Sequence, residues 1–330
     1  MYNFIIYTDG FNEIEDMLFG EASNRDNVYI VSKNSCIGNR ILQCLFRFHY
    51  SFRINNKINL PLKRIWFPTL DRIFSNDDPT IYVFLTSWYY PEYFEYLRKK
   101  HPTCKLAFYF GDTVISKKRV IKNLDISYLK KIMDFVGSYN PKDVKEYGLS
   151  YLQMCYSKYP KINELPEKEK RDFIFIGAAR SRMNLILRCY EQAKRDGVNY
   201  LFYVVNHDNT DIHIDDENFV LTNTPMEFAD YLGYVMNSKC ILEIVDSETD
   251  GGTLRFWDAI MYNKKIVTNN KSVLSSKFYN EDNVVCSKDF LNVDFKKIIN
   301  NEIVDYHYDG ENSPVRFLKT IADIVCGGKQ

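Results

Sequence analysis

The residues best suited to chemistry lie in one late segment of the chain, Cys240–Ala259. Its apolar start is typical of a strand that ends near Glu243 and leads into an acidic loop reaching Asp250. Three residues that suit a phosphate follow directly: Gly251, Gly252 and Thr253. Glycines let a ligand approach the backbone, threonine can cap a helix, and the first N–H groups of a helix bind anions. The segment therefore predicts a pyrophosphate site.

Arg255 and Asp258 fall within the helix that this segment predicts. A cation in the first turn is unfavourable against the helix dipole, so Arg255 indicates that an anion belongs nearby. Asp258 can accept hydrogen bonds from ribose hydroxyls, as a nucleotide site requires. The alternative interpretation is a capped helix whose charges are only solvated.

A second candidate segment, Phe173–Arg182, has an apolar strand that runs into Gly177 and then into a helix. Gly177 permits close backbone approach, and the start of the helix offers unpaired N–H groups to an anion. Positive charge from Arg180 can bind phosphate, so we expect Gly177, Arg180 and Ser181 to contact the phosphate of a nucleotide. Two of the three glycines of the dinucleotide fingerprint are missing here. The alternative is an ordinary strand–helix turn with surface arginines.

The elements that must position these residues follow one rhythm, in which short apolar runs alternate with amphipathic stretches. In the first half we predict strands at 4–7, 28–31, 81–85, 105–110, 135–137 and 152–155. Predicted helices between them span 38–48, 91–100, 126–133 and 141–147. Strands this short that alternate with helices are typical of βαβ units and a parallel sheet.

The polar segment 159–172 interrupts this rhythm and is predicted to be an interdomain linker. Afterwards we predict strands at 173–176, 200–205, 219–221, 240–245 and 265–268. Predicted helices span 183–194, 226–236, 253–262 and, last, 313–325. The expected fold class is α/β, with two doubly wound Rossmann-like domains facing a cleft, where such sheets bind ligands.

Composition agrees with two globular domains, because 330 residues are too many for one ordinary core. No run approaches the ~20 apolar residues of a membrane span, and no signal peptide begins the chain, so we expect a cytoplasmic protein. Eight cysteines without a Cys-x-x-Cys pair indicate reduced thiols. Residues 1–165 hold 23 Lys/Arg and 17 Asp/Glu. This basic half can face anionic lipid or a phosphate-bearing acceptor, although a solvated surface explains it equally well.

The run from Asp250 to Thr268 resembles the donor-site signature of GT-B glycosyltransferases, particularly those of bacterial lipopolysaccharide and capsular polysaccharide biosynthesis. Those enzymes carry an acidic residue, a glycine-rich turn, a Glu-Ala pair and then two basic residues before a strand. The matching positions here are Asp250, Gly251-Gly252-Thr253, Asp258-Ala259 and Lys264-Lys265. Both acidic positions are aspartate, whose shorter arm weakens the match at Asp250. Segments 109–112 and 134–149 resemble the same enzymes.

The resemblance implies an N-terminal acceptor domain at 1–160, a donor domain at 170–312, and a helix at 313–330 that crosses back to the first domain. It implies a nucleotide diphosphate sugar donor, a glycan or lipid-linked acceptor, and no required metal or other cofactor. Arg255 would stabilise the leaving diphosphate. Peripheral contact with the inner membrane surface fits such an acceptor. No aromatic RNA-binding signature or zinc finger argues for nucleic acid.

An inverting transferase also needs a general base to deprotonate the acceptor hydroxyl. Asp9 and Asp112 follow predicted strands of the first half and are the two candidates, although each is equally suited to a turn beside glycine. A retaining enzyme does not require such a base. Trp88 also follows a strand, where it forms either an acceptor platform or part of the core.

Other functions remain open at the level of sequence. A sugar-nucleotide epimerase of similar build would release sugar and nucleotide without an acceptor, and a non-catalytic component of an assembly complex would bind nucleotide sugar or glycan without turnover. His207 and His213 resemble a metal cluster by composition, but their segment is typical of a polar loop. Asp246-Ser-Glu248 imitates the Asp-x-Asp motif of single-domain glycosyltransferases but stands too late in the chain.

Overall fold

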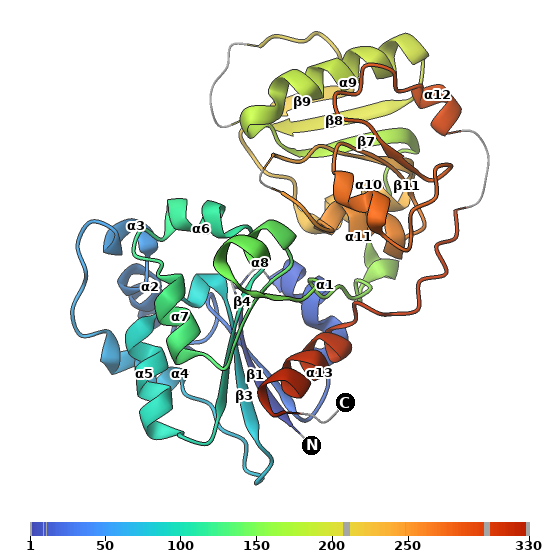
Figure 1. The fold of residues 1–330 in the computed structure, drawn as a ribbon. Helices are drawn as coiled ribbons and strands as arrows, with labels where there is room; N and C mark the ends of the chain where they lie inside the picture. The colour runs from blue at the N-terminus through green and yellow to red at the C-terminus, as the bar shows by residue number, and fades with distance from the viewer. Residues whose placement is uncertain are drawn as a thin grey trace. The chain divides into compact units, whose positions relative to one another are not determined.

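The computed structural model describes residues 2–8, 10, 12–206, 212–247, 249–299 and 304–327. The chain forms two compact units, which Figure 1 shows in colours running from the N- to the C-terminus. The first unit combines Met1–Pro160 with Glu311–Gln330, and the second is Lys161–Gly310. The polypeptide therefore passes between the units twice, near Pro160 and near Gly310.

The described part of the first unit contains a six-stranded parallel sheet with the order β2-β1-β3-β4-β5-β6. Its strands are β1 (Asn3–Thr8), β2 (Val28–Ser32), β3 (Thr80–Leu85), β4 (Lys105–Phe110), β5 (Phe135–Ser138) and β6 (Ser150–Tyr151). Every residue of β1 and β3 is buried, which explains why these runs are almost wholly apolar. The chain reverses its direction of travel across the sheet between β1 and β3. That reversal marks the switch point, where doubly wound sheets bind ligands.

Helices surround this sheet in the βαβ manner (Figure 1). They are α1 (Asn12–Ser23), α2 (Arg40–His49), α3 (Phe52–Asn55), α4 (Phe67–Leu70), α5 (Pro91–Lys100), α6 (Val114–Val120), α7 (Ile126–Ile132), α8 (Pro141–Tyr147) and α13 (Pro314–Val325). Local chemistry sets several of their ends. At α8, the Asn140 side chain accepts a hydrogen bond from the amide of Lys142, and Gly148 ends the helix at φ 61°.

The last helix, α13, belongs to the first unit although it comes from the far end of the chain. Phe317 is buried, and its ring packs edge-on against Tyr109 of β4 and Phe19 of α1, with centroid distances of 5.0 and 6.5 Å. The amide of Tyr156 donates to the carbonyl of Asn312 at 2.8 Å. These contacts join the two chain segments of the unit in one core.

The second unit holds a parallel sheet whose six described strands follow the order β12-β11-β10-β7-β8-β9. Its strands are β7 (Arg171–Ala178), β8 (Tyr200–Val205), β9 (Phe219–Thr222), β10 (Ser238–Glu243), β11 (Lys265–Thr268) and β12 (Val284–Cys286). Its helices are α9 (Met183–Asp196), α10 (Phe228–Met236), α11 (Leu254–Met261) and α12 (Phe295–Ile298). Here the switch point lies between β7 and β10. The predicted α/β class is confirmed.

The predicted strand at 152–155 is wrong. The last strand of the first sheet is β6, and the amide of Leu152 makes one further bond to the carbonyl of Ser138, at 3.1 Å. Beyond it the chain leaves the sheet, and the amide of Ser157 donates to the carbonyl of Met17 on α1 at 2.6 Å. Met154 and Cys155 are buried in a connecting segment. A buried connection and a buried strand both appear in the sequence as a short apolar run, so the two cannot be told apart there.

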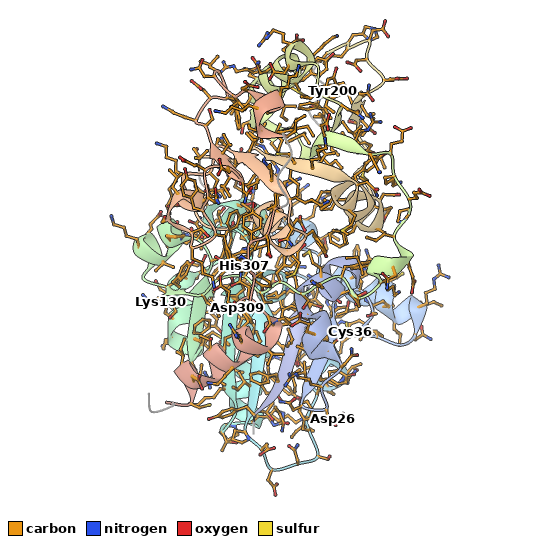
Figure 2. All side chains as sticks on the ribbon, turned by 90° about the vertical axis from the view of Figure 1, so that its right-hand side faces the viewer. Asp26, Cys36, Lys130, Tyr200, His307 and Asp309 are labelled. Atoms are coloured by element: carbon orange, nitrogen blue, oxygen red, sulfur yellow. The ribbon has the colours of Figure 1, made fainter. Side chains whose placement is uncertain are left out.

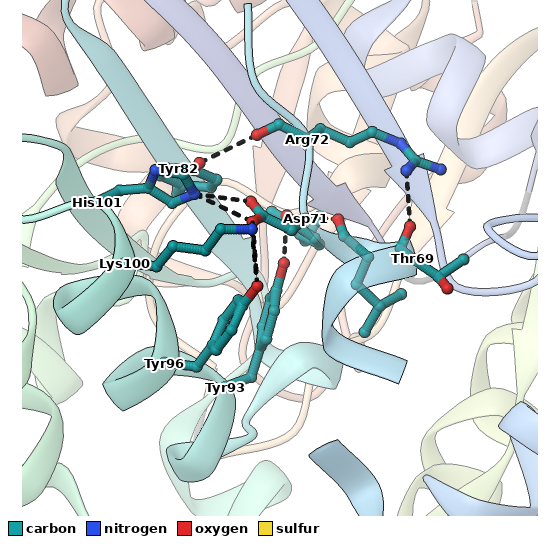
Figure 3. Close-up of polar contacts among 10 residues, drawn as sticks. Thr69, Asp71, Arg72, Tyr82, Tyr93, Tyr96, Lys100 and His101 are labelled. Atoms are coloured by element: carbon teal, nitrogen blue, oxygen red, sulfur yellow. Dashed lines mark hydrogen bonds and ion pairs between the residues drawn. The ribbon is translucent and has the colours of Figure 1, made fainter. Parts of the chain in front are cut away.

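A buried polar cluster stands where β3 begins (Figure 3). Asp71, whose side chain is only 6% exposed, accepts from Lys100 Nζ at 2.6 Å and lies 3.1 Å from His101 Nε2. Tyr96 donates to the same carboxylate at 3.3 Å. The cluster fixes the last turn of α5 to the segment before β3, at the sheet edge opposite the carboxyl ends. It is therefore a structural element and not part of the candidate site.

The eight cysteines are free thiols, and Cys155, Cys189 and Cys240 are buried. Burial raises the pKa of the Cys36 thiol to about 11. Within the described residues, no helix has the length and apolar character needed to cross a bilayer.

Candidate functional site

The switch point of the second sheet brings the two candidate segments together. β7 ends at Ala178 and its neighbour β10 ends at Glu243, so residues that follow both strands meet at one edge of the sheet. Helix α11 begins shortly after β10, and the Arg180–Arg182 turn follows β7. The site is thus built from two segments that are far apart in sequence.

Arg255 on α11 lies directly against Gly177 on β7. A Cβ placed on Gly177 would stand 2.4 Å from Nη2 of Arg255, which no side chain tolerates without displacing the guanidinium. The same Nη2 donates to the carbonyl of Ile176. Nε of Arg255 is buried and has no hydrogen-bond partner in the part of the chain that the structure describes. Glycine is therefore required at 177 so that Arg255 can reach across the edge of the sheet.

Asp246, just beyond β10, organises the turn that follows β7. Ser181 donates its hydroxyl to Oδ1 of Asp246 at 2.9 Å. Arg180, which has φ 47° and a largely exposed side chain, lies 4.0 Å from Oδ2 of Asp246. Arg182 lies 3.8 Å from Oδ1 and also donates to the carbonyls of Ile244 and Ala178, so it ties the ends of β7 and β10 together.

Three guanidinium groups therefore converge on this edge. Burial lowers the pKa of Arg182 to about 10; the positive charges of Arg255 and Arg180 act in the same direction, while Asp246 opposes them. Because Arg182 is occupied by backbone carbonyls, Arg180 and Arg255 are the cations placed to meet a ligand. Crowded like charges of this kind favour the binding of an anion.

The start of α11 is held by a buried carboxylate. Thr253 caps the helix by accepting from the amide of Phe256 at 3.4 Å, and it donates its own hydroxyl to Glu243. Thr268 donates to the other oxygen of Glu243 at 2.5 Å. Glu243 is 1% exposed, and burial raises the pKa of its carboxyl. The structure thus places Glu243 behind the helix start, where it positions Thr253 and does not line an open surface.

Both glycines before α11 occupy positions that disfavour a side chain. Gly251 has φ 116°, a conformation that other residues rarely adopt, and its carbonyl accepts from Asn270 Nδ2 at 2.8 Å. A Cβ on Gly252 would stand 2.8 Å from Nε1 of Trp257. The turn leaves the first N–H groups of α11 at the carboxyl edge of the sheet, where a helix start attracts phosphate.

Asp250 and Asp258, the two aspartates that match the glycosyltransferase signature, lie in different environments. Asp258 is 2% exposed and accepts from the hydroxyl of Tyr231 at 2.5 Å. Burial and the Asp258 charge hold the pKa of Tyr231 well above its usual range. Asp250 is half-buried in the loop before Gly251. A ribose contact by Asp258 stays a prediction, and it requires Tyr231 to share or yield that carboxylate.

In the first unit, the candidate base Asp112 contacts residues at the start of α6. Its carboxylate accepts from the amide of Thr113 at 2.9 Å and lies 3.5 Å from Nζ of Lys117. Asp9 lies outside the described residues. Trp88 belongs to the core, because it is fully buried and donates Nε1–H to the carbonyl of Thr8 at 2.5 Å.

Sequence reasoning missed three polar residues near these sites. The sequence around Asp246 suggests only a metal motif, whereas the residue anchors the turn after β7. Asn270 follows β11 and holds Gly251. Glu15 on α1 accepts from Thr8 and from the amide of Gly10 at the end of β1. A polar residue that follows a buried strand by two or three positions is the available signal for Asn270 and Asp246.

The patterns considered for metal binding lie partly outside the described residues. Asp246 pairs with arginines, while Glu248 and His207 lie outside the described residues. Over the ranges that the structure covers, there is no group of three or more His, Cys, Asp or Glu side chains placed to hold a metal ion.

A cavity of about 520 Å³ opens in the first unit between α3, the start of α5 and the end of α6. Aromatic rings line it, including Tyr89, Tyr90 and Phe67, together with the amide side chains of Asn59 and Asn123. Rings and amides are groups that recognise sugars, by stacking and hydrogen bonding.

Two parallel sheets flanked by helices, each doubly wound, give this chain the GT-B fold of two Rossmann-like domains. An α,α-trehalose-phosphate synthase (UDP-forming) from Burkholderia xenovorans, in complex with glucose-6-phosphate, is similar with a TM-score of 0.55 and 8% identity, covering 98% of this chain and 100% of that chain. Anabaena HepE in complex with UDP and glucose is similar with a TM-score of 0.56 and 8% identity, again covering 98% and 100%.

The trehalose-6-phosphate synthase OtsA gives a TM-score of 0.52 at 8% identity over 98% of this chain and 95% of that chain. No family model and no curated protein matches the sequence. At such low identities the likeness shows the fold, and the chemistry must be argued from the residues of this chain.

Proposed function

We propose that this protein is a glycosyltransferase that moves a sugar from a nucleotide diphosphate sugar to a glycan or lipid-linked acceptor. The observation that carries the proposal is the convergence of Arg180, Arg182 and Arg255 on the switch point of the second sheet, beside the start of α11. A doubly charged diphosphate suits that edge, because helix N–H groups and guanidinium groups both stabilise it. Solved structures of the same fold include UDP-forming synthases.

The proposed chemistry follows from charge. As the glycosidic bond to the diphosphate breaks, negative charge grows on the leaving oxygens, and Arg255 and the first amides of α11 stabilise it. Since arginines supply this positive charge, we propose that the reaction needs no divalent metal, so turnover should persist in EDTA. Asp9 and Asp112 remain the candidate general bases for an inverting reaction.

The acceptor is assigned to the first unit, whose aromatic cavity has the composition of a sugar site. We propose a role in the synthesis of surface polysaccharide such as lipopolysaccharide or capsule, on the cytoplasmic side of the membrane. The support is the sequence resemblance at Asp250–Thr268 and the basic first half of the chain.

The test begins with nucleotide binding. UDP, ADP, GDP and dTDP are added singly while thermal unfolding is followed, since a ligand of the native state raises the melting temperature. At least one diphosphate should raise it for the wild type and raise it less for Arg255→Ala. A control variant, Arg195→Ala, removes an exposed arginine on α9 and should behave as the wild type. No shift with any nucleotide would contradict the proposal.

Turnover is then measured as release of nucleoside diphosphate from a panel of nucleotide sugars with and without acceptors. Arg255→Ala should lower turnover by about 10²-fold, the scale of removing a key charge stabiliser, and Arg195→Ala should not. Near-normal activity of Arg255→Ala would remove Arg255 from the mechanism. Sugar released without any acceptor would favour the epimerase, and binding without turnover across the panel would favour a non-catalytic component.

A further inference from the structure

The first unit exposes an unusual number of apolar side chains on helix α2. Ile41, Leu45 and Phe48 stand at positions i, i+4 and i+7, and all three are exposed, Ile41 at 73%. Leu42 lies beside them and is also exposed. The opposite side of the helix packs into the core through Gln43 and Phe46. Helix α2 therefore carries one apolar face toward the core and a second one toward solvent, whereas a surface helix ordinarily has a polar outer face.

The segment after α3 continues this exposed apolar surface. Ile58, Leu62 and Ile65 are exposed at 68, 74 and 61%. The segment is held to the end of α2, because Trp66 donates Nε1–H to His49 and the Tyr50 hydroxyl donates to the carbonyl of Lys63, at 2.8 and 3.1 Å. We call these seven residues the α2 face: Ile41, Leu42, Leu45, Phe48, Ile58, Leu62 and Ile65.

The segment that carries the α2 face holds charge of one sign, although Glu92 of α5 lies 3.7 Å from Nε of Arg64. Residues 27–70 contain seven Lys or Arg residues and no Asp or Glu. Six of the seven fall between Arg40 and Arg64, on the same elements as the apolar residues. Figure 2 labels two residues near the start of this stretch. Asp26, the acidic residue that immediately precedes the stretch, lies just before β2, and Cys36 lies just after β2. An ordinary segment of this length mixes both signs, so the excess of positive charge here suits a negatively charged partner.

We propose that the α2 face docks on a lipid bilayer that contains anionic lipids. Exposed apolar patches of this kind mark interaction sites, and a helix with apolar side chains and flanking cations lies in the plane of a membrane interface. The apolar side chains enter the acyl boundary while the lysines and arginines meet lipid phosphates. The cavity of the first unit is lined by Phe52, Asn59 and Lys63, which lie among the residues of this face, so a lipid-linked acceptor would find its sugar site beside the bilayer. That last use rests on the proposed function, whereas the docking does not.

The test is sedimentation of the full chain with sucrose-loaded vesicles of phosphatidylcholine alone or mixed with phosphatidylglycerol. Binding should be at least about tenfold stronger to the anionic vesicles and should weaken at high salt. Leu45→Ser with Phe48→Ser should lower the partition coefficient by about tenfold or more, as should Arg47→Ser with Arg53→Ser. The matched control is Leu291→Ser, which removes an equally exposed apolar side chain from the second unit.

Because the substituted side chains are exposed, these variants should fold and should keep nucleotide diphosphate binding, which separates this proposal from the proposed function. Equal binding of wild type and variants, or no binding to anionic vesicles, would overturn it. So would a dimer in gel filtration that the same substitutions dissociate, since the α2 face would then meet a second copy of the chain.

Discussion

Single residues at the switch point of the second sheet depend on one another. Gly177 lacks a side chain so that Arg255 can lie on it, and Arg255 in turn leaves Nε without a partner among the described residues. A buried guanidinium nitrogen without an acceptor is costly in a folded protein, so a ligand that supplies one would gain from it. The glycine at position 177 is therefore explained by the packing of Arg255 in the candidate site and not by the conformation of the strand.

Replacing Gly177 with Ala tests this dependence. The new Cβ would stand 2.4 Å from Nη2 of Arg255, and the guanidinium is the flexible end of its side chain, so it should move while the fold survives. We expect a loss of stability of about 1–2 kcal/mol but a fall in turnover of roughly 10²-fold, because a small misplacement of a catalytic group is that harmful. Urea unfolding and steady-state kinetics measure the two effects.

The control for that prediction is a double variant that combines Gly177→Ala with Arg255→Ala. If Gly177→Ala acts through Arg255, it should add little to the kinetic loss already caused by Arg255→Ala. Gly38→Ala, at a glycine with nothing within 4 Å of an added Cβ, should leave turnover unchanged. If the fold-losses in turnover of the two single variants multiplied in the double variant, Gly177 would act independently of Arg255.

At the scale of elements, the connection from β10 to α11 is held from behind by Glu243. This carboxylate joins three elements, because it takes hydrogen bonds from Thr253 at the start of α11 and from Thr268 at the end of β11. Its burial places a titratable group in the centre of the donor unit. The stability of this connection should therefore depend on pH.

The sign of that dependence follows from the raised pKa of Glu243. The folded state holds the proton to higher pH than the unfolded chain does, so stability is lost as pH rises through the folded pKa. Glu243→Gln removes the titration. Its free energy of unfolding, relative to the wild type, should therefore increase between about pH 4 and pH 8, by about 1.4 kcal/mol for each unit of pKa shift.

Urea unfolding of both proteins over that pH range checks the prediction, with Glu191→Gln on the exposed side of α9 as the control. A difference that is constant with pH, or one that favours the wild type more at higher pH, would show that Glu243 is stabilised as a carboxylate by its two hydroxyl donors.

The sequence was sufficient for elements whose pattern is local. Pro91–Lys100 and Pro141–Tyr147 begin at proline and carry amphipathic spacing, and their predicted bounds agree with α5 and α8. The edge strand β6 and the short helices α3 and α4 were missed or misplaced, because their conformation depends on packing against distant segments.

The candidate site was predictable only in part. Glycines before a helix and an arginine in its first turn are local signals, and the structure brings Gly177 and Arg255 together. The burial of Glu243 and Asp258 was not predictable, since it depends on Thr268 and Tyr231, which lie on other elements. The exposed face of α2 escaped notice because an apolar helix pattern normally indicates a core.

At the scale of the whole molecule, the core of the first unit is completed by a helix that follows the second unit in sequence. Helix α13 packs on α1 and β4 through Phe317, so the first core is incomplete until α13 has been made. The stability of the first unit should therefore depend on residues that follow the second unit in sequence, and a destabilising substitution in α13 should destabilise the first unit.

Phe317→Ala tests this arrangement. Removing a buried ring that contacts Phe19 and Tyr109 should cost about 3–5 kcal/mol, a large part of the stability of an ordinary domain. Hydrogen exchange should accelerate in α1 and β4, which lie in the first third of the sequence, while β7 and β8 keep their protection. Ile324→Ala, on the exposed side of the same helix, should change neither. Loss of protection in β7 and β8 would show that α13 supports the second unit, because only the elements that it packs on should open with it.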